Sequence, residues 1–98
     1  MNTFSKQPSE TYTIGIEFAG KLPTGATIIS GTVSAKDQAN IDQTATVLSG
    51  TSATISGTEA LIKVLAGVHG QNYRIRFVVT LSTADLLEED VLMRVANE

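Results

Sequence analysis

The sequence predicts an all-β fold, and three observations lead to that prediction. β-Branched residues are abundant, with thirteen threonines, eight valines and eight isoleucines, and such residues favour strands over helices. Apolar and polar side chains alternate over residues 73–81, the period-two pattern of a strand with one buried face. Tyr73 opens this segment, just after a glycine turn that ends at Gly70. This arrangement is typical of the tyrosine corner of an immunoglobulin-like Greek-key β-sandwich, in which the ring packs in the core and the hydroxyl bonds to upstream backbone.

The N-terminal part of the chain predicts an arm followed by a strand. Residues 1–10 are polar and contain one apolar anchor, Phe4, so we expect a flexible arm that leads into a single domain over residues 11–98. Residues 12–18 alternate between apolar and polar side chains and are predicted to form a half-buried strand. Proline and glycine then indicate a turn over residues 19–25.

The middle of the chain predicts three further strands. Residues 26–35 form the first of them, with Ile29, Val33 and Ala35 on its inward face. A polar loop is expected over residues 36–43. Two short strands follow in the prediction, at residues 44–48 and 51–56, separated by a serine and a glycine.

The C-terminal part completes a set of seven predicted strands. Residues 59–66 are the fifth strand, residues 73–81 the sixth, and residues 88–96 the last, after a turn at residues 82–85. Short strands spaced about ten residues apart, with Gly or Pro between them, are typical of a Greek-key sandwich.

Two segments of this part also fit a helix. Residues 58–67 contain good helix formers, with an acidic first turn and a glycine at the end, and Asp85 could cap a second helix. The strand interpretation is favoured because residues 91–95 continue the apolar face that a hairpin from residues 73–81 requires. Glu89 falls on the same inward face, so either the hairpin loop extends past it or a bulge resets the register.

Composition limits the classes of partner. The chain has 98 residues, enough for one small core, and it has no cysteine. Its formal net charge is −3, without a cluster of basic residues, which argues against nucleic acid as a partner. No apolar run approaches the length of a membrane span. The N-terminus lacks the apolar stretch of a signal peptide, so we expect the chain to begin in a cytoplasm and not to be secreted by that route.

Two glycine motifs resemble ligand-binding loops but do not fit their structural context. Residues 15–22 are one residue from a phosphate-binding loop, yet Leu22 replaces the required hydroxyl residue and Pro23 prevents a helix after Lys21. Residues 67–70 match the GXXG loop of KH domains only in spacing. His69 is the single histidine and is interpreted as a solvated turn residue.

Acidic residues form two groups with different interpretations. Asp37, Asn40 and Asp42 could place oxygens around a hard cation, although their spacing is not that of an EF-hand; whether this loop binds a cation stays open. The acidic run at residues 88–90 lies within cross-strand reach of Arg76 and is interpreted as protection of a strand edge rather than as catalytic carboxylates. We therefore predict no catalytic, cofactor-binding or metal-binding residue and no cofactor.

Read from end to end, the chain resembles a family of small immunoglobulin-like proteins encoded among the virion structural genes of tailed phages and prophages. The resemblance rests on the Pro-Ser-Glu-Thr approach to the first strand at residues 8–16, on the turn and isoleucine strand at 22–28, on the aliphatic strand at 60–65, on the glycine–tyrosine segment at 67–73, and on the final hairpin to residue 95. The stretch 36–56 lies outside the resemblance. Members of the family often carry a core tryptophan, and this chain has none.

The resemblance implies a non-enzymatic structural or assembly protein of the head, neck or tail, which binds itself or other virion proteins and ends in the virion. Phe4 in the arm is the residue we expect to make such contacts. The alternative is an immunoglobulin-like recognition module for a host-surface receptor or a glycan. Such sites usually present several aromatic side chains, and of the five aromatic residues only Phe4 is not predicted inside.

Overall fold

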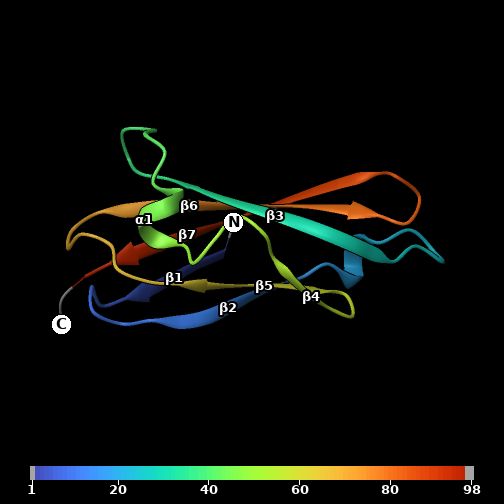
Figure 1. Ribbon diagram of the computed structural model, residues 1–98, viewed down its shortest axis with the longest axis horizontal. Helices are drawn as coiled ribbons and strands as arrows, with labels where there is room; N and C mark the ends of the chain where they lie inside the picture. Colours follow the sequence, from blue (N-terminus) through green and yellow to red (C-terminus); the bar gives the residue numbers. More distant parts are fainter. Residues whose placement is uncertain (1, 97–98) are drawn as a thin grey trace.

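The computed structural model describes residues 2–96 as two β-sheets packed face to face, with little helix (Figure 1). The strands are β1 (Asn2–Lys6), β2 (Tyr12–Glu17), β3 (Ile28–Lys36), β4 (Thr54–Ser56), β5 (Glu59–Val64), β6 (Asn72–Leu81) and β7 (Leu86–Val95). Two short helical turns accompany them, η1 (Ala19–Lys21) and α1 (Thr44–Val47). The prediction of an all-β fold is confirmed, and both segments with helical alternatives, β5 and β7, are strands.

The strands divide into a four-stranded sheet in the order β1-β7-β6-β3 and a three-stranded sheet in the order β2-β5-β4. All neighbours are antiparallel except β1 and β7, which run parallel. The chain changes sheet between β1 and β2, between β2 and β3, between β3 and β4, and between β5 and β6. Strands β1 and β2 therefore stand at edges of different sheets.

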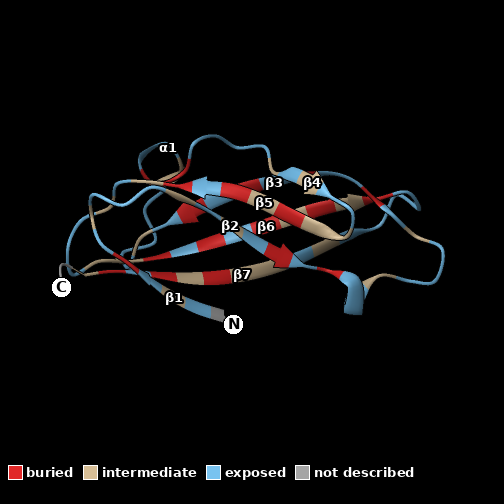
Figure 2. Ribbon diagram, turned by 90° about the horizontal axis from the view of Figure 1, so that it is seen from below, coloured by how far each residue is buried: buried red, intermediate tan, exposed pale blue. Residues whose placement is uncertain are grey.

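The core lies between the sheets and is built by alternation along the strands, visible as buried and exposed bands in Figure 2. Strand β6 contributes every second residue from Tyr73 to Leu81, and β7 contributes Val91, Met93 and Val95. Because side chains of a strand point alternately to the two faces, this period is what the sequence pattern predicts. Val47 and Leu48, at the end of α1, are also buried.

The β6–β7 hairpin keeps Glu89 on the inward-facing side of β7. The pairing runs without a shift from Asn72 opposite Arg94 to Thr80 opposite Leu86, and Phe77 lies opposite Glu89. Both sequence-based explanations, a longer loop or a bulge, are therefore wrong. The inward position is tolerated because Lys21 Nζ lies 2.5 Å from a Glu89 carboxylate oxygen, so the charge is paired at the end of the sandwich.

The N-terminal segment differs from the expected flexible arm, because Asn2–Lys6 form β1 along one side of β7. Its inward positions are Phe4, which packs against the core, and Lys6, which is buried. A lysine at an inward position hides the strand pattern in the sequence. Through this parallel pairing, backbone N–H and C=O groups of β7 bond to β1, where they would otherwise have to bond to water.

Residues 44–48, predicted as a strand, instead include α1. The Asp42 carboxylate accepts a hydrogen bond from the Thr44 N–H at 2.9 Å, and the N–H groups of Val47 and Leu48 bond back to the carbonyls of Gln43 and Thr44. Local bonding by an aspartate side chain thus begins a helical turn. Within residues 2–96, no helix is long and apolar enough to cross a membrane.

A second local difference lies at the start of β3. The register with β6 shifts between Ile28 and Ser30, so Ile28 is in the core whereas Ile29 is 62% exposed. The bulge reverses the expected inward position of Ile29, since one extra residue exchanges the two faces of a strand.

Candidate interaction site

Strands β1 and β2 lie beside each other without pairing, which leaves an open seam along one side of the sandwich. In residues 2–96, β1 pairs with β7 and β2 pairs with β5, and no ladder joins β1 to β2. The seam is bridged at one end by side chains. The Tyr12 hydroxyl donates to the Ser5 carbonyl at 3.1 Å, and the Phe4 and Tyr12 rings meet edge to face with centroids 6.2 Å apart.

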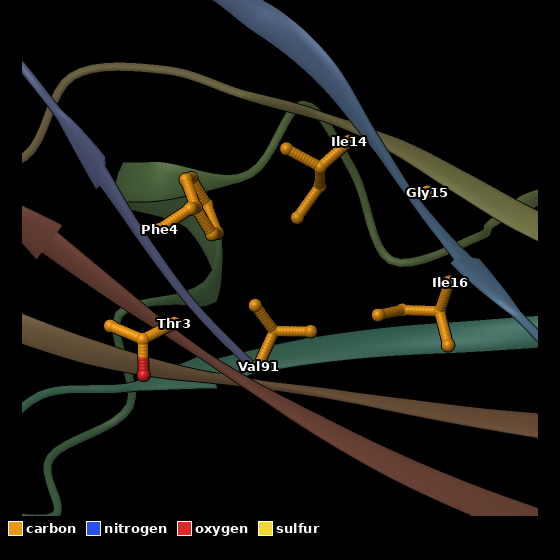
Figure 3. A pocket seen from close by; sticks show the side chains of 6 residues that line it. All are labelled: Thr3, Phe4, Ile14, Gly15, Ile16 and Val91. Atoms are coloured by element: carbon orange, nitrogen blue, oxygen red, sulfur yellow. The ribbon is translucent and has the colours of Figure 1, made fainter. Parts of the chain in front are cut away.

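A cavity of about 300 Å³ occupies the seam beyond this bridge. Side chains from β1, β2 and β7 converge on it (Figure 3), and its lining is Thr3, Phe4, Ile14, Gly15, Ile16 and Val91. Most of these side chains are aliphatic or aromatic, so the cavity is suited to an apolar group. We call this cavity and its lining the β1–β2 seam.

The alternation of the β2–β5 ladder determines which backbone groups of β2 face the seam. Phe18 N–H donates to the Thr58 carbonyl at 2.9 Å, continuing the register of the two strands. In an antiparallel pair, residues with both groups directed at the partner alternate with residues whose groups point away. The even residues of β2 therefore bond to β5, and Thr13, Gly15 and Glu17 direct N–H and C=O to the open edge.

Carboxylates border this edge on the outer face of the small sheet. A Cβ on Gly15 would lie 2.8 Å from a Glu59 carboxylate oxygen, so Glu59 extends over the glycine. Glu17 lies opposite Glu59 in the ladder. Hydrogen bonds from the Thr58 hydroxyl and from the Ala19 N–H lower the pKa of Glu17, which keeps it ionised. None of the ion pairs found in residues 2–96 includes Glu17 or Glu59.

Lys6 fixes the end of β1 at the border of the seam. Its side chain is 2% exposed, and its ammonium donates to the carbonyls of Gln7, at 2.8 Å, of Pro8, at 3.2 Å, and of Ala66. Burial lowers the pKa of Lys6, while the charge of Glu10 acts in the opposite direction. The ammonium thus joins the β1–β2 turn to the loop after β5.

Tyr73, one of the two residues assigned to the corner, is 2% exposed. Its hydroxyl oxygen accepts a hydrogen bond from the Val68 N–H at 3.0 Å. In the same turn Gly70 has a φ of +86°, and its N–H donates to the Val95 carbonyl at 2.9 Å. The ring and hydroxyl therefore connect the turn before β6 to the core.

Tyr73→Phe is expected to lower the free energy of unfolding by about 1–3 kcal/mol, because it leaves the Val68 N–H, whose hydrogen bond is partly buried, without its acceptor. Chemical denaturation of the two proteins measures this difference. Tyr12→Phe is the control, since its hydroxyl bonds to an exposed carbonyl. A Tyr73→Phe protein as stable as the parent would contradict a structural role for the hydroxyl.

The acidic run at residues 88–90 is paired with cations. Arg76 Nε lies 2.9 Å from an Asp90 oxygen and 3.0 Å from a Glu88 oxygen, and the hydrogen bonds from Arg76 lower the pKa of Asp90. Strand β1 pairs with β7 only from Val91 onward. The acidic run therefore occupies the part of the β7 edge that no strand covers, where charge opposes pairing with another sheet.

The carboxylate oxygens of Asp37 accept hydrogen bonds from within the 36–43 loop. Asp37 accepts hydrogen bonds from the N–H groups of Ala39 and Ile41, at 2.9 and 3.0 Å, and from the Gln43 amide at 3.2 Å. These bonds lower the pKa of Asp37. Among the described residues, no group of three or more His, Cys, Asp or Glu side chains is placed to hold a metal ion.

The two glycine motifs lie in ordinary strand and turn geometry. Gly15 is inside β2, and Lys21 ends the short η1 turn, so residues 15–22 do not form a loop around an anion. His69 is exposed in the turn before β6 and is not among the residues that line the β1–β2 seam.

Residues 6–94 match the model of a family described as podophage GP4 fiber-tail adaptor protein gp77. The chain belongs to this family. None of the curated proteins matches it. The match makes the chain a structural protein of the phage tail that acts through protein contacts, and it confirms the coarse form of the resemblance to phage virion proteins.

Sequence reasoning identified only part of the seam. Phe4 was expected to make contacts, and it lines the seam. The sequence pattern assigns Ile14, Ile16 and Val91 only to the core, and Gly15 only to the motif at residues 15–22. A sequence pattern gives the faces of a strand, but the order of strands in a sheet decides which edge is open.

Proposed function

We propose that this protein is a non-enzymatic adaptor that connects a fibre to the body of a phage tail. The family match over residues 6–94 carries this proposal, because the family is described as a fiber-tail adaptor. A fold with an open strand edge beside an apolar cavity supports a role in protein contacts. Assembly in the host cytoplasm, followed by residence in the virion, is part of the same proposal.

We further propose that the sandwich is immunoglobulin-like, with Tyr73 and Gly70 as its tyrosine corner. The support is the order of strands, with repeated crossing between a four-stranded and a three-stranded sheet, and the bond from the Val68 N–H to the Tyr73 hydroxyl.

Deletion of the gene from the phage that encodes this chain tests the adaptor function. We expect mutant particles with assembled tail bodies and without fibres, and we expect expression of the full chain in trans to restore the fibres. Electron microscopy and gel analysis of purified particles provide the measurement. Particles that keep their full set of fibres without this protein would contradict the proposal.

A further inference from the structure

We propose that the open edge of β2 binds an extended strand of another virion protein. The incoming strand pairs with the backbone of Thr13, Gly15 and Glu17, places an apolar side chain in the β1–β2 seam, and carries Lys or Arg on its outward face. This inference rests on the proposed adaptor function and identifies the surface that carries it out.

The first support is that β2 is an unprotected edge strand; the opposite side of the seam is formed by β1, the edge strand of the larger sheet. Proteins usually guard such edges by covering chain, short strands, bulges or charge. The outer edge of β3 is covered, since Val33 N–H bonds to the Thr51 carbonyl and Ala53 N–H to the Gly31 carbonyl. Strand β4 has three residues, and the uncovered part of β7 carries the acidic run at residues 88–90.

Along its open edge strand β2 pairs with no further strand of the described residues, and its one charged residue, Glu17, lies on the exposed face. Its pairing with β5 runs over six residues without a bulge, and the segment contains no proline and no inward-facing charge. At its centre Gly15 has no side chain of its own, and the side chains of Leu61 and Glu59 lie over its outer face. Three outward-directed peptide groups, at Thr13, Gly15 and Glu17, are available to a new strand.

The second support is the seam beside this edge. A strand that extends the small sheet past β2 places every second side chain over the gap toward β1. Ile14, Ile16 and Val91 line that gap and converge on it (Figure 3). A cavity of about 300 Å³ has room for an aliphatic side chain, and its burial there removes apolar surface of both partners from water.

Charge identifies the occupant as a partner with basic residues. Outward side chains of the incoming strand lie beside Glu17 and Glu59, two carboxylates outside the ion pairs of the described residues. A lysine or arginine there gains a charge-assisted contact. A glutamate or aspartate there is repelled, so the edge selects against acidic strands.

The same charges disfavour a second copy of this chain. In the symmetric antiparallel register, Gly15 of one copy lies opposite Gly15 of the other, with Cα atoms about 5.5 Å apart. Each glycine carries a Glu59 carboxylate directly above it. Self-pairing would therefore bring two carboxylates close together, a destabilising contact for a directly opposed pair.

Hydrogen exchange of residues 11–18 tests the proposal, measured in the free protein and in purified tails that contain it. We expect exchange of this segment to slow about tenfold or more in the tails, because the three outward amides gain partners. Unchanged exchange in tails would overturn the strand proposal and leave the adaptor function standing. Absence of the parent protein from tails would overturn the adaptor function itself.

Thr13→Pro, with Thr13→Val as its matched control, provides the second measurement. Proline removes an N–H that faces the open edge and leaves the β2–β5 ladder intact, whereas valine keeps the N–H and the branched side chain. We expect incorporation of Thr13→Pro into tails to fall about tenfold, because the hydrogen bond from the residue 13 N–H to the incoming strand is lost and the pairing register is disturbed. Incorporation of Thr13→Val should match that of the parent. Equal incorporation of both variants, each shown to be folded by thermal unfolding, would overturn the proposal.

Discussion

Lys6→Ala is expected to lower the free energy of unfolding by about 2–4 kcal/mol, a large effect for a single lysine. The Lys6 ammonium donates to three carbonyls, those of Gln7, Pro8 and Ala66, and the side chain is 2% exposed. Alanine removes these charged hydrogen bonds, takes the ammonium donor from the carbonyls of Pro8 and Ala66, and opens space where the aliphatic stem packed. Denaturant unfolding of parent and variant measures the difference.

Two further substitutions help to interpret the Lys6 effect. Lys6→Met keeps most of the aliphatic stem but has no donor, so it measures the effect of the hydrogen bonds. Lys36→Ala is the control: it removes a lysine that is exposed and should change stability by less than about 0.5 kcal/mol. A loss of less than about 0.5 kcal/mol for Lys6→Ala would show that the ammonium does not hold β1 in place.

Gly67→Ala is expected to destabilise the protein by about 2–5 kcal/mol, for two reasons that add. Gly67 has a φ of +100°, a backbone conformation that costs an L-residue roughly 1–2 kcal/mol. A Cβ there would also lie 2.8 Å from Val95 Cγ2, so the core around Val95 must shift, at about 1–3 kcal/mol. Thermal or chemical unfolding provides the measurement.

Two other glycines provide matched controls for Gly67→Ala. Gly70→Ala introduces the backbone strain alone, because φ is +86° and no atom lies within 4 Å of the new Cβ. Gly20→Ala meets neither problem and should be close to neutral. If Gly67→Ala were no more destabilising than Gly70→Ala, the expected clash with Val95 would not contribute to the loss of stability.

The strands with regular alternation are those that the sequence predicts. Residues 73–81 read as a strand because period two continues over nine positions, and the structure places β6 at Asn72–Leu81. The failures have local physical causes. At residues 2–6 a buried lysine interrupts the apolar pattern, near Ile29 a bulge reverses the faces, and at α1 an aspartate hydrogen bond begins a helical turn.

The candidate site is harder to predict than the strands, since it depends on sheet order. Alternation over residues 12–18 assigns Ile14 and Ile16 to the core in any arrangement of the sheets. Only the absence of a ladder between β1 and β2 in the described residues makes them the lining of an open seam. The sequence indicates Phe4 because it is the aromatic residue of a polar segment. Its contact with Tyr12, however, follows only from the fold.

The location of this chain in the purified virion tests the account most directly. Virions are separated into heads, tail bodies and fibres, and the chain is quantified in each fraction by mass spectrometry with labelled peptides. The account predicts a fixed number of copies per tail, none in the heads, and loss of the chain together with the fibres when fibres are detached. Enrichment in the head fraction, or absence from mature particles, would contradict the assignment of this protein to the tail.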